Sequence, residues 1–435
     1  MFDALLQLPV IDGPFMWILC GLSIALLVVL LIRRPTPRRV LTTLIGFLGG
    51  VLLAVLGLWI VAGLMHAFGG PLPIQAVLII AAVFAACGIA IVNLWDSPGW
   101  RKGVAIVALV VFILTGVFGV NAYYGLDRTL GSMFGITVEK PIPLPTPVPT
   151  QTADPDVPLY ASWKPPADMP AKGSRGTQVI PATLSGFPAR PAGIYLPPAA
   201  LVANPPALPL VIMMMGQPGN PDIDPISDVM DQFAAQHQGL APIVLVADQL
   251  AVPASDTTCM DSPELGNAET YVTKDVPNWA RRNLNILQDP AHWVVAGYSN
   301  GGACAFKFGA EYPEVFGNVL SVSGEIYPGA DNPGVAVTRM FHGDQAAYEA
   351  SWPANILASG KHRYPDTWAV FTAGGNDKEY QDEAAQAAAA ATAAGWHVTN
   401  EVLPGMDHSF AALTAGLQAG FTILYPRLDL APATQ

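Results

Sequence analysis

Four long apolar runs near the start of the chain constrain its fold more than any other feature of the sequence. They lie at about 14–32, 40–68, 74–94 and 103–124. Each run is long enough to cross a hydrocarbon core of about 30 Å as a helix. Charged residues make up only 12% of the chain, which also indicates a large membrane-embedded portion. The sequence therefore predicts an all-α region with four transmembrane helices over residues 1–138.

The first run does not resemble a cleavable signal peptide. Acidic residues Asp3 and Asp12 precede it, and no small-residue cleavage site follows it before the second run. We therefore expect this run to stay attached to the protein as a membrane anchor.

Basic residues in the loops predict the orientation of the membrane region. They follow the first and third runs, whereas “GGPLP” after the second run carries no charge. These residues are Arg33, Arg34, Arg38, Arg39, Arg101 and Lys102. Because short loops rich in Lys and Arg stay in the cytoplasm, everything after the fourth run is expected outside it. The alternative is an arginine patch for lipid headgroups or nucleic acid, but the pattern repeats at the second basic loop.

The part of the chain that follows the fourth run carries most of the net charge of −12. Such acidity argues against nucleic acid as a partner and against adhesion to anionic lipid. Residues 139–175 are dense in proline and show no hydrophobic period, as is typical of a linker. Fully stretched, this linker would reach roughly 100 Å, although parts of it are free to lie on the next domain.

Residues 176–435 alternate between short apolar runs and amphipathic stretches. Strands are expected at 177–184, 192–198, 208–216, 241–248, 292–299, 317–325, 366–375 and 397–405. Helices are expected at 226–238, 268–286, 302–313, 348–360 and 378–395. Near-continuous apolar strands are typical of a parallel sheet covered on both faces. The pattern predicts a mostly parallel sheet with helices on both sides.

The segment “WVVAGYSNGGACAF” contains a candidate nucleophile. Gly297, Ser299 and Gly301 form a G-x-S-x-G pattern between a predicted buried strand and a predicted helix. Small flanking residues allow the close backbone approach of a sharp strand-to-helix turn, which lifts the serine hydroxyl to the sheet edge. This context predicts that Ser299 is a catalytic nucleophile.

A serine needs a general base and an acid that orients the base. His408 follows the last predicted strand in “LPGMDHSF”, and Asp377 follows the preceding strand in “AGGND”. The order serine, acid, histidine is the one used by this architecture. The alternatives are Asp344 or Asp407 as the acid and His342 or His397 as the base, and a satisfied structural histidine at position 408.

Backbone amides are expected to stabilise the oxyanion that forms during acyl transfer. One is the amide of Asn300, directly after the nucleophile, and the other is that of Gln217 in “MMMGQPGNPD” after the third strand. The alternative for the second position is an ordinary glycine–proline turn.

Cysteine usage and the absence of metal patterns limit the remaining chemistry. Cys20 and Cys87 lie within the apolar runs, so Cys259 and Cys304 form an even pair outside them. In an oxidising compartment this pair is a possible disulfide, and two buried thiols are the alternative. The sequence shows no H-E-x-x-H pattern, paired C-x-x-C pattern or P-loop, so neither a metal nor a nucleotide cofactor is expected.

The domain at about 176–426 resembles the α/β-hydrolase superfamily, and within it the “putative esterase” branch. That branch includes esterase D, enterochelin esterases and mycolyltransferases of the antigen 85 type. The resemblance rests on “GYSNGG”, “GGND” and “GMDHSF”. It implies Ser299, Asp377 and His408 as a triad that works without a cofactor.

These patterns together predict a serine esterase in the cell membrane, with its catalytic domain outside the cytoplasm. Its expected substrate is a carboxylic ester of a lipid or cell-envelope component, because the lipid bilayer is the expected partner of the anchor. One alternative is an acyltransferase of mycolyltransferase type that uses the same acyl-enzyme. Another is an inactive hydrolase fold that serves as a binding or scaffold domain.

Overall fold

A boundary between Val138 and Glu139 divides the computed structural model into two units. The structure describes residues 5–11, 13–64, 72–95, 97–125, 127–134, 136, 140–145 and 157–432. Several predicted features lie outside these residues. They are Asp3, Asp12, the end of the second apolar run (65–68), the first part of the uncharged loop (69–71) and the middle of the linker (146–156).

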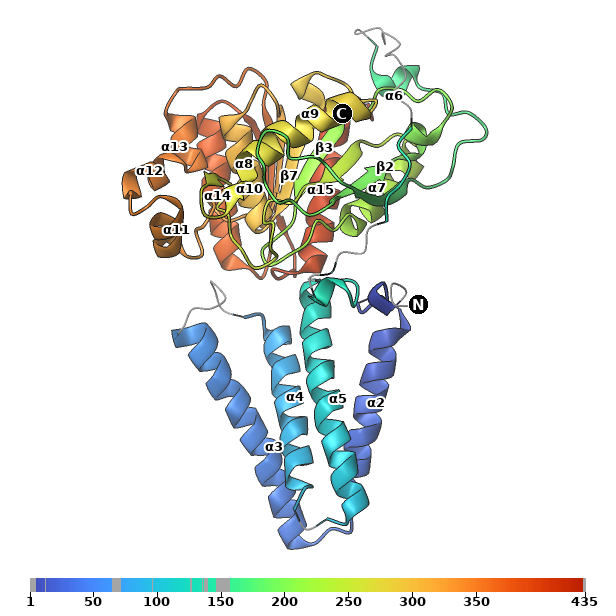
Figure 1. The fold of residues 1–435 in the computed structure, drawn as a ribbon, viewed down its shortest axis with the longest axis vertical. Coiled ribbons are helices and arrows are strands. Elements are labelled where there is room, and N and C mark those ends of the chain that lie inside the picture. The colour runs from blue at the N-terminus through green and yellow to red at the C-terminus, as the bar shows by residue number, and fades with distance from the viewer. Residues whose placement is uncertain are drawn as a thin grey trace. The chain divides into compact units, whose positions relative to one another are not determined.

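Unit 1 contains four described helices that are long and apolar enough to cross a membrane (Figure 1). They are α2 (Pro14–Leu31), α3 (Pro37–Leu58, continued by the π-helix η1, Trp59–Leu64), α4 (Ile74–Val92) and α5 (Gly99–Tyr124). At most 33% of any span is buried inside the structure. Large apolar side chains such as Trp17, which is 82% exposed, therefore form a surface that fits lipid better than water.

Close backbone contact joins α3 to α4. A Cβ atom on Gly88 would lie 1.9 Å from the carbonyl oxygen of Gly46, and one on Gly50 would lie 2.2 Å from that of Phe84. Only glycine permits this approach, which is how helices pack in the absence of a hydrophobic driving force between them.

Arg101 connects α5 to the end of α2. Its guanidinium donates to the carbonyl oxygens of Val29 (2.8 Å), Leu30 (3.0 Å) and Ile32 (3.3 Å). Those carbonyls lie in the last turn of α2, where the helix leaves its own acceptors without donors. One of the basic residues that predicted the orientation of the spans thus also caps a helix.

Unit 2 is built on an eight-stranded sheet with the order β1-β2-β4-β3-β7-β8-β9-β10. The strands are β1 (Ser174–Gln178), β2 (Ala192–Leu196), β3 (Leu210–Met214), β4 (Ile243–Val246), β7 (Trp293–Tyr298), β8 (Asn318–Val322), β9 (Trp368–Gly374) and β10 (His397–Leu403). Each neighbouring pair in the series β4-β3-β7-β8-β9-β10 is parallel. Strand β2 pairs antiparallel with both β1 and β4. This is the mostly parallel sheet that the sequence predicts.

Helices cover both faces of this sheet. They are α7 (Asp224–Gln236), α8 (Ala268–Thr270), α9 (Val276–Asn283), α10 (Asn300–Glu311), α11 (Pro333–Met340), α12 (Gln345–Ala350), α13 (Pro353–Ala358), α14 (Lys378–Ala393) and α15 (Phe410–Arg427). Neighbouring residues of β8 face opposite sides: Val319 lies against Gly309 of α10, and Leu320 lies against Gly420 of α15. Helix α7 packs with α15, whereas α13 packs with α10 and α14.

Described parts of the predicted linker lie on unit 2. Lys140 exchanges hydrogen bonds with Thr177 of β1 at 2.8 Å, and the indole of Trp163, just after the short helix α6 (Leu159–Ser162), donates to the carbonyl of Gln238. These contacts shorten the stretch of chain that is available to act as a tether.

Candidate active site

Ser299 occupies a sharp turn between β7 and α10. Its backbone angles are φ 54° and ψ −123°, and a positive φ is costly for a residue that has a Cβ atom. The turn is held by a 3.0 Å bond from the Ser299 amide to Val322 of β8 and a 2.8 Å bond from the Gly302 amide to the Ser299 carbonyl. Ser299 is therefore fixed at the carboxyl edge of the sheet and at the N-terminus of α10.

The two glycines that flank this turn have no room for side chains. A Cβ atom on Gly297 would lie 1.9 Å from the carbonyl oxygen of Gly301, and one on Gly301 would lie 2.3 Å from that of Met214. The G-x-S-x-G pattern thus follows from backbone packing between β7, α10 and the end of β3.

His408 and Asp377 lie side by side on the loops after β10 and β9. The His408 Nδ1 and Asp377 Oδ2 atoms are 3.3 Å apart. Both atoms are buried, and neither makes a hydrogen bond within the described part of the chain, so the pair is close but not aligned as a hydrogen bond. The imidazole lies between two tyrosine rings, with Tyr298 at a centroid distance of 5.1 Å and Tyr380 at 4.1 Å. Because Tyr298 precedes Ser299, this packing brings the histidine beside the nucleophile turn.

Backbone contacts hold the two loops together. The amide of Gly375 donates to Leu403 (2.6 Å) and that of Asn376 donates to Met406 (2.9 Å). The positions of the acid and the histidine therefore depend on each other.

The alternative residues lie in other surroundings. The carboxylate of Asp344 accepts the amide of Ala347 and caps α12, and His342 is exposed in the same loop. His397 begins β10 at the other end of the sheet, 3.4 Å from Asp366. Asp407 adjoins His408 in the chain, but the carboxylate oxygen that lies 3.3 Å from His408 Nδ1 belongs to Asp377.

The loop after β3 lies next to Ser299. A Cβ atom on Gly216 would lie 3.3 Å from the Cβ atom of Ser299. Gln217 is the next residue in the chain after this contact. The peptide bond between Gln217 and Pro218 is cis, and the Gln217 side chain donates to Ala254. Asn300 is the first residue of α10, so its amide has no acceptor within the helix.

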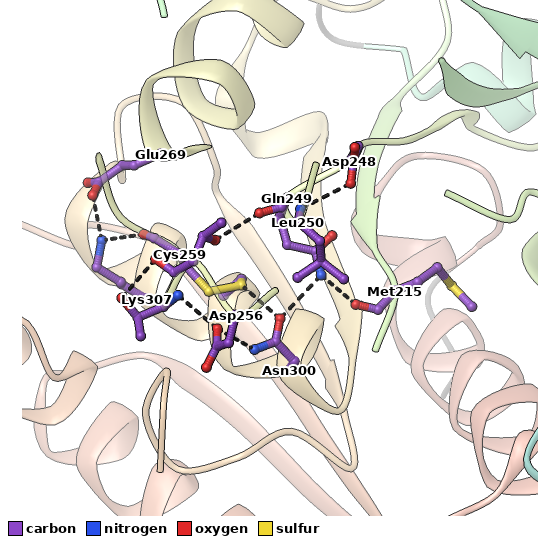
Figure 2. Close-up of a disulfide and its surroundings, with 12 residues drawn as sticks. Met215, Asp248, Gln249, Leu250, Asp256, Cys259, Glu269, Asn300 and Lys307 are labelled. Carbon is purple, nitrogen blue, oxygen red and sulfur yellow. Dashed lines mark hydrogen bonds and ion pairs between the residues drawn. A yellow bond between two sulfur atoms is a disulfide. The ribbon is translucent and has the colours of Figure 1, made fainter. Parts of the chain in front are cut away.

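A disulfide joins the loop after β4 to α10 (Figure 2). Its members are Cys259 and Cys304, whose Cα atoms are 5.4 Å apart. One turn along α10, the buried ammonium group of Lys307 donates to the carbonyl of Cys259 (3.0 Å) and to Glu269 (2.8 Å). Both contacts hold the Cys259 loop against the helix that begins just after Ser299.

Two carboxyl groups, those of Asp331 and Glu379, interact electrostatically with His408, and two more lie near Asp331. Burial raises the pKa of Glu325 well above its ordinary value, and negative charge on Asp331 and Asp256 adds to the effect. Burial likewise raises the pKa of Glu383, on α14, to about 7, with contributions from Glu379 and Asp331.

Sequence reasoning missed two polar residues beside the site, Gln249 and Asp256. The Asn300 side chain donates to Asp256 Oδ1 (3.1 Å) and its oxygen accepts from Gln249 (3.3 Å). Both residues belong to a loop that carries no recognisable motif and lies over 40 positions before Asn300 in the chain. Only the folded sheet brings them to Asn300, the residue after Ser299.

Comparisons with known proteins agree with this architecture. The model of the family described as “Putative esterase” matches residues 189–419, which is more than half of the chain. An uncharacterized protein of Corynebacterium glutamicum is 32% identical over 245 residues, covering 54% of this chain and 57% of that protein. The iron(III) enterobactin esterase of Dickeya dadantii is 28% identical over 186 residues, covering 40% and 41%. The chain thus spans about half the length of these relatives.

Solved structures of esterases are also similar to part of the chain. A ferulic acid esterase is 16% identical with a TM-score of 0.48, and the match covers 60% of this chain and 99% of that one. The S-formylglutathione hydrolase of Agrobacterium tumefaciens is 18% identical, also with a TM-score of 0.48, covering 60% and 97%. At these values the likenesses carry no argument about activity. The family match shows membership: the chain belongs to the family described as “Putative esterase”.

Proposed function

We propose that this protein is a membrane-anchored serine esterase that cleaves a carboxylic ester of a lipid or cell-envelope component outside the cytoplasm. The observation that carries the proposal is the strained turn at Ser299, with φ 54° at the start of α10. A non-glycine residue is held in such a conformation where the surrounding structure imposes it, and such residues cluster at active sites. The His408–Asp377 pair on neighbouring loops supplies the expected base and acid.

The reaction follows from these positions. Ser299 Oγ attacks the ester carbonyl carbon while His408 accepts its proton, and Asp377 orients the imidazolium. The amides of Asn300 and Gln217 donate to the oxyanion. The carbon–oxygen bond to the alcohol then breaks, and His408 protonates the departing alcohol. Water, deprotonated by His408, attacks the acyl-enzyme. The bond between the acyl carbon and Ser299 Oγ then breaks, His408 returns the proton to Oγ, and the carboxylic acid leaves.

Charge around the site supports a restriction on the acyl group. Asp331 and Glu379 interact electrostatically with His408, and Asp256 binds the side chain of Asn300. An anionic acyl group would be repelled by these carboxylates, whereas a neutral or cationic one would not. We expect slower hydrolysis of a p-nitrophenyl hemisuccinate than of p-nitrophenyl butyrate at equal concentration, and equal rates would contradict the restriction.

The location is supported by the apolar surface of unit 1 and by the basic loops. An enzyme tied to the membrane at that face meets lipids and envelope components before soluble metabolites.

The test is hydrolysis by the full-length protein in detergent. Wild type should cleave p-nitrophenyl butyrate and Ser299→Ala should not. Incubation with membrane lipid extracts, followed by mass spectrometry, then identifies the substrate. Transfer of the acyl group to a lipid or sugar hydroxyl would indicate an acyltransferase, and no turnover by wild type would indicate a binding domain.

A further inference from the structure

Gln249 is a buried side chain in the loop that follows β4. It is 2% exposed, and its amide nitrogen donates both to the carbonyl oxygen of Met215 (2.6 Å) and to Oδ1 of Asn300 (3.3 Å). Figure 2 shows Gln249 between these two partners. A side-chain amide has two N–H groups, so these bonds use its full capacity as a donor.

The two acceptors belong to the segments that supply the proposed oxyanion amides. Met215 lies two residues before Gln217, in the loop after β3, and Asn300 directly follows Ser299. The bonds from Gln249 therefore connect one segment to the other through a single planar group.

The neighbours of Gln249 hold its backbone in place. The buried carboxylate of Asp248 binds the guanidinium of Arg190 through two bonds, of 2.9 and 2.7 Å, and accepts the amide of Leu250 at 3.0 Å. The hydroxyl of Thr257 donates to the carbonyl of Gln249 at 2.8 Å. The amide of Gln249 thus projects from a fixed support.

Asn300 is oriented from its other side. Its Nδ2 atom donates to Asp256 Oδ1 at 3.1 Å, so its oxygen must face Gln249. Asp256 lies in the same loop as Cys259, which is bonded to Cys304 of α10. The loop after β4 is therefore attached to α10 at two points around the first turn.

We propose that Gln249 is a positioning residue that sets the spacing between the Gln217 and Asn300 amides of the oxyanion site. This inference rests on the proposed esterase function. Oxyanion donors act only when held within roughly 0.5 Å of their productive positions. Without Gln249, the loop after β3 and the start of α10 lose their shared donor, and the two amides separate in the transition state.

The experiment compares Gln249→Met and Gln249→Glu with wild type in the full-length protein. Methionine keeps the length without a donor, and glutamate keeps the shape but cannot donate when ionised. The matched control is Gln178→Met, which removes a 2.6 Å bond from another glutamine to the Ile142 carbonyl, on the edge strand β1.

The measurements are kcat and KM for p-nitrophenyl butyrate and the rate constant of inactivation by a fluorophosphonate, whose phosphoryl oxygen occupies the oxyanion site. Titration with the same reagent counts the active sites, so unfolded protein does not affect the values. Both Gln249 variants should lose about 10- to 100-fold in kcat and in the inactivation rate constant. KM should change by less than about threefold, and Gln178→Met should match wild type.

Two results would overturn this inference and leave the esterase function intact. One is kcat per titrated site within twofold of wild type in both Gln249 variants. The other is an equal loss in Gln178→Met, which would show a general effect of lost stability. A wild-type protein that neither hydrolyses the ester nor reacts with the fluorophosphonate would instead refute the proposed function itself, and the inference with it.

Discussion

Individual residues at the site combine local strain with contacts from distant parts of the chain. The conformation of Ser299 costs about 1–3 kcal/mol, which the packed backbone around Gly297 and Gly301 must offset. The sequence predicts this strained turn, because the spacing of Gly297, Ser299 and Gly301 is typical of it. The sequence does not predict the contacts of Gln249 and Asp256 with Asn300, because these contacts depend on where β4 lies in the sheet.

Substitution of the proposed triad should separate catalysis from folding. Ser299→Ala and His408→Ala should each remove nearly all esterase activity, and Asp377→Asn should lower kcat by about 10⁴-fold because the imidazole loses its orientation. Asp344→Asn is the matched control, since that carboxylate caps α12 instead. The measurement is kcat alongside the thermal unfolding midpoint. A collapse in Asp344→Asn with normal turnover in Asp377→Asn would mean that Asp344 is the acid.

Glu383 should make unfolding depend on pH. Its pKa is about 7 in the folded protein against an ordinary value of 4.5. The folded state thus holds a proton that the unfolded state releases, so stability falls as pH rises from about 4.5 to about 7. Glu383→Gln should remove this loss. The unfolding midpoint of the variant minus that of wild type should therefore increase as pH rises from about 4.5 to about 8. Asp382→Asn, on an exposed neighbour in α14, is the control. A difference between Glu383→Gln and wild type that is independent of pH would contradict the expectation.

At the scale of elements, the alternation of apolar and amphipathic segments predicts the sheet well and the helices less well. All eight predicted strands overlap strands of the main sheet, although β1 begins at Ser174 and ends before Pro181. The helix predicted at 348–360 is wrong as a single element. Pro353 disfavours the α conformation of the residue before it, which divides the segment into α12 and α13. The prediction also omits α11 and α15.

The disulfide should stabilise the loop after β4. Replacing both cysteines, Cys259→Ala with Cys304→Ala, should lower the free energy of unfolding by about 2–4 kcal/mol, since the bond closes a loop of 45 residues. Replacing the free cysteines Cys20 and Cys87 in the same way is the control. Alkylation of denatured, unreduced protein should modify two thiols, and modification of all four would show that the bond does not form.

At the scale of the whole molecule, an apolar four-helix unit and an acidic hydrolase unit share one chain. The helices expose apolar side chains over most of their length, and they are long and apolar enough to cross a membrane. The basic residues at their loops predict which end faces the cytoplasm, although Arg101 is engaged in capping α2. Arg101 therefore contributes both to the charge pattern that predicts the orientation and to the capping of α2.

The predicted orientation places Ser299 outside the cytoplasm. A membrane-impermeant serine-hydrolase probe should label wild type on intact cells and should leave Ser299→Ala unlabelled. Labelling of wild type only after the cells are broken open would reverse the orientation and remove the basis for an envelope substrate.

The central claim, that Ser299 is the nucleophile of an ester hydrolase, is tested most directly by mapping a fluorophosphonate adduct on the purified full-length protein. Mass spectrometry of the digested protein should find one adduct per chain, on the peptide that contains Ser299. His408→Ala should slow its formation by orders of magnitude, because the serine then lacks its base. An adduct on another serine, or no adduct on an otherwise folded protein, would contradict the account.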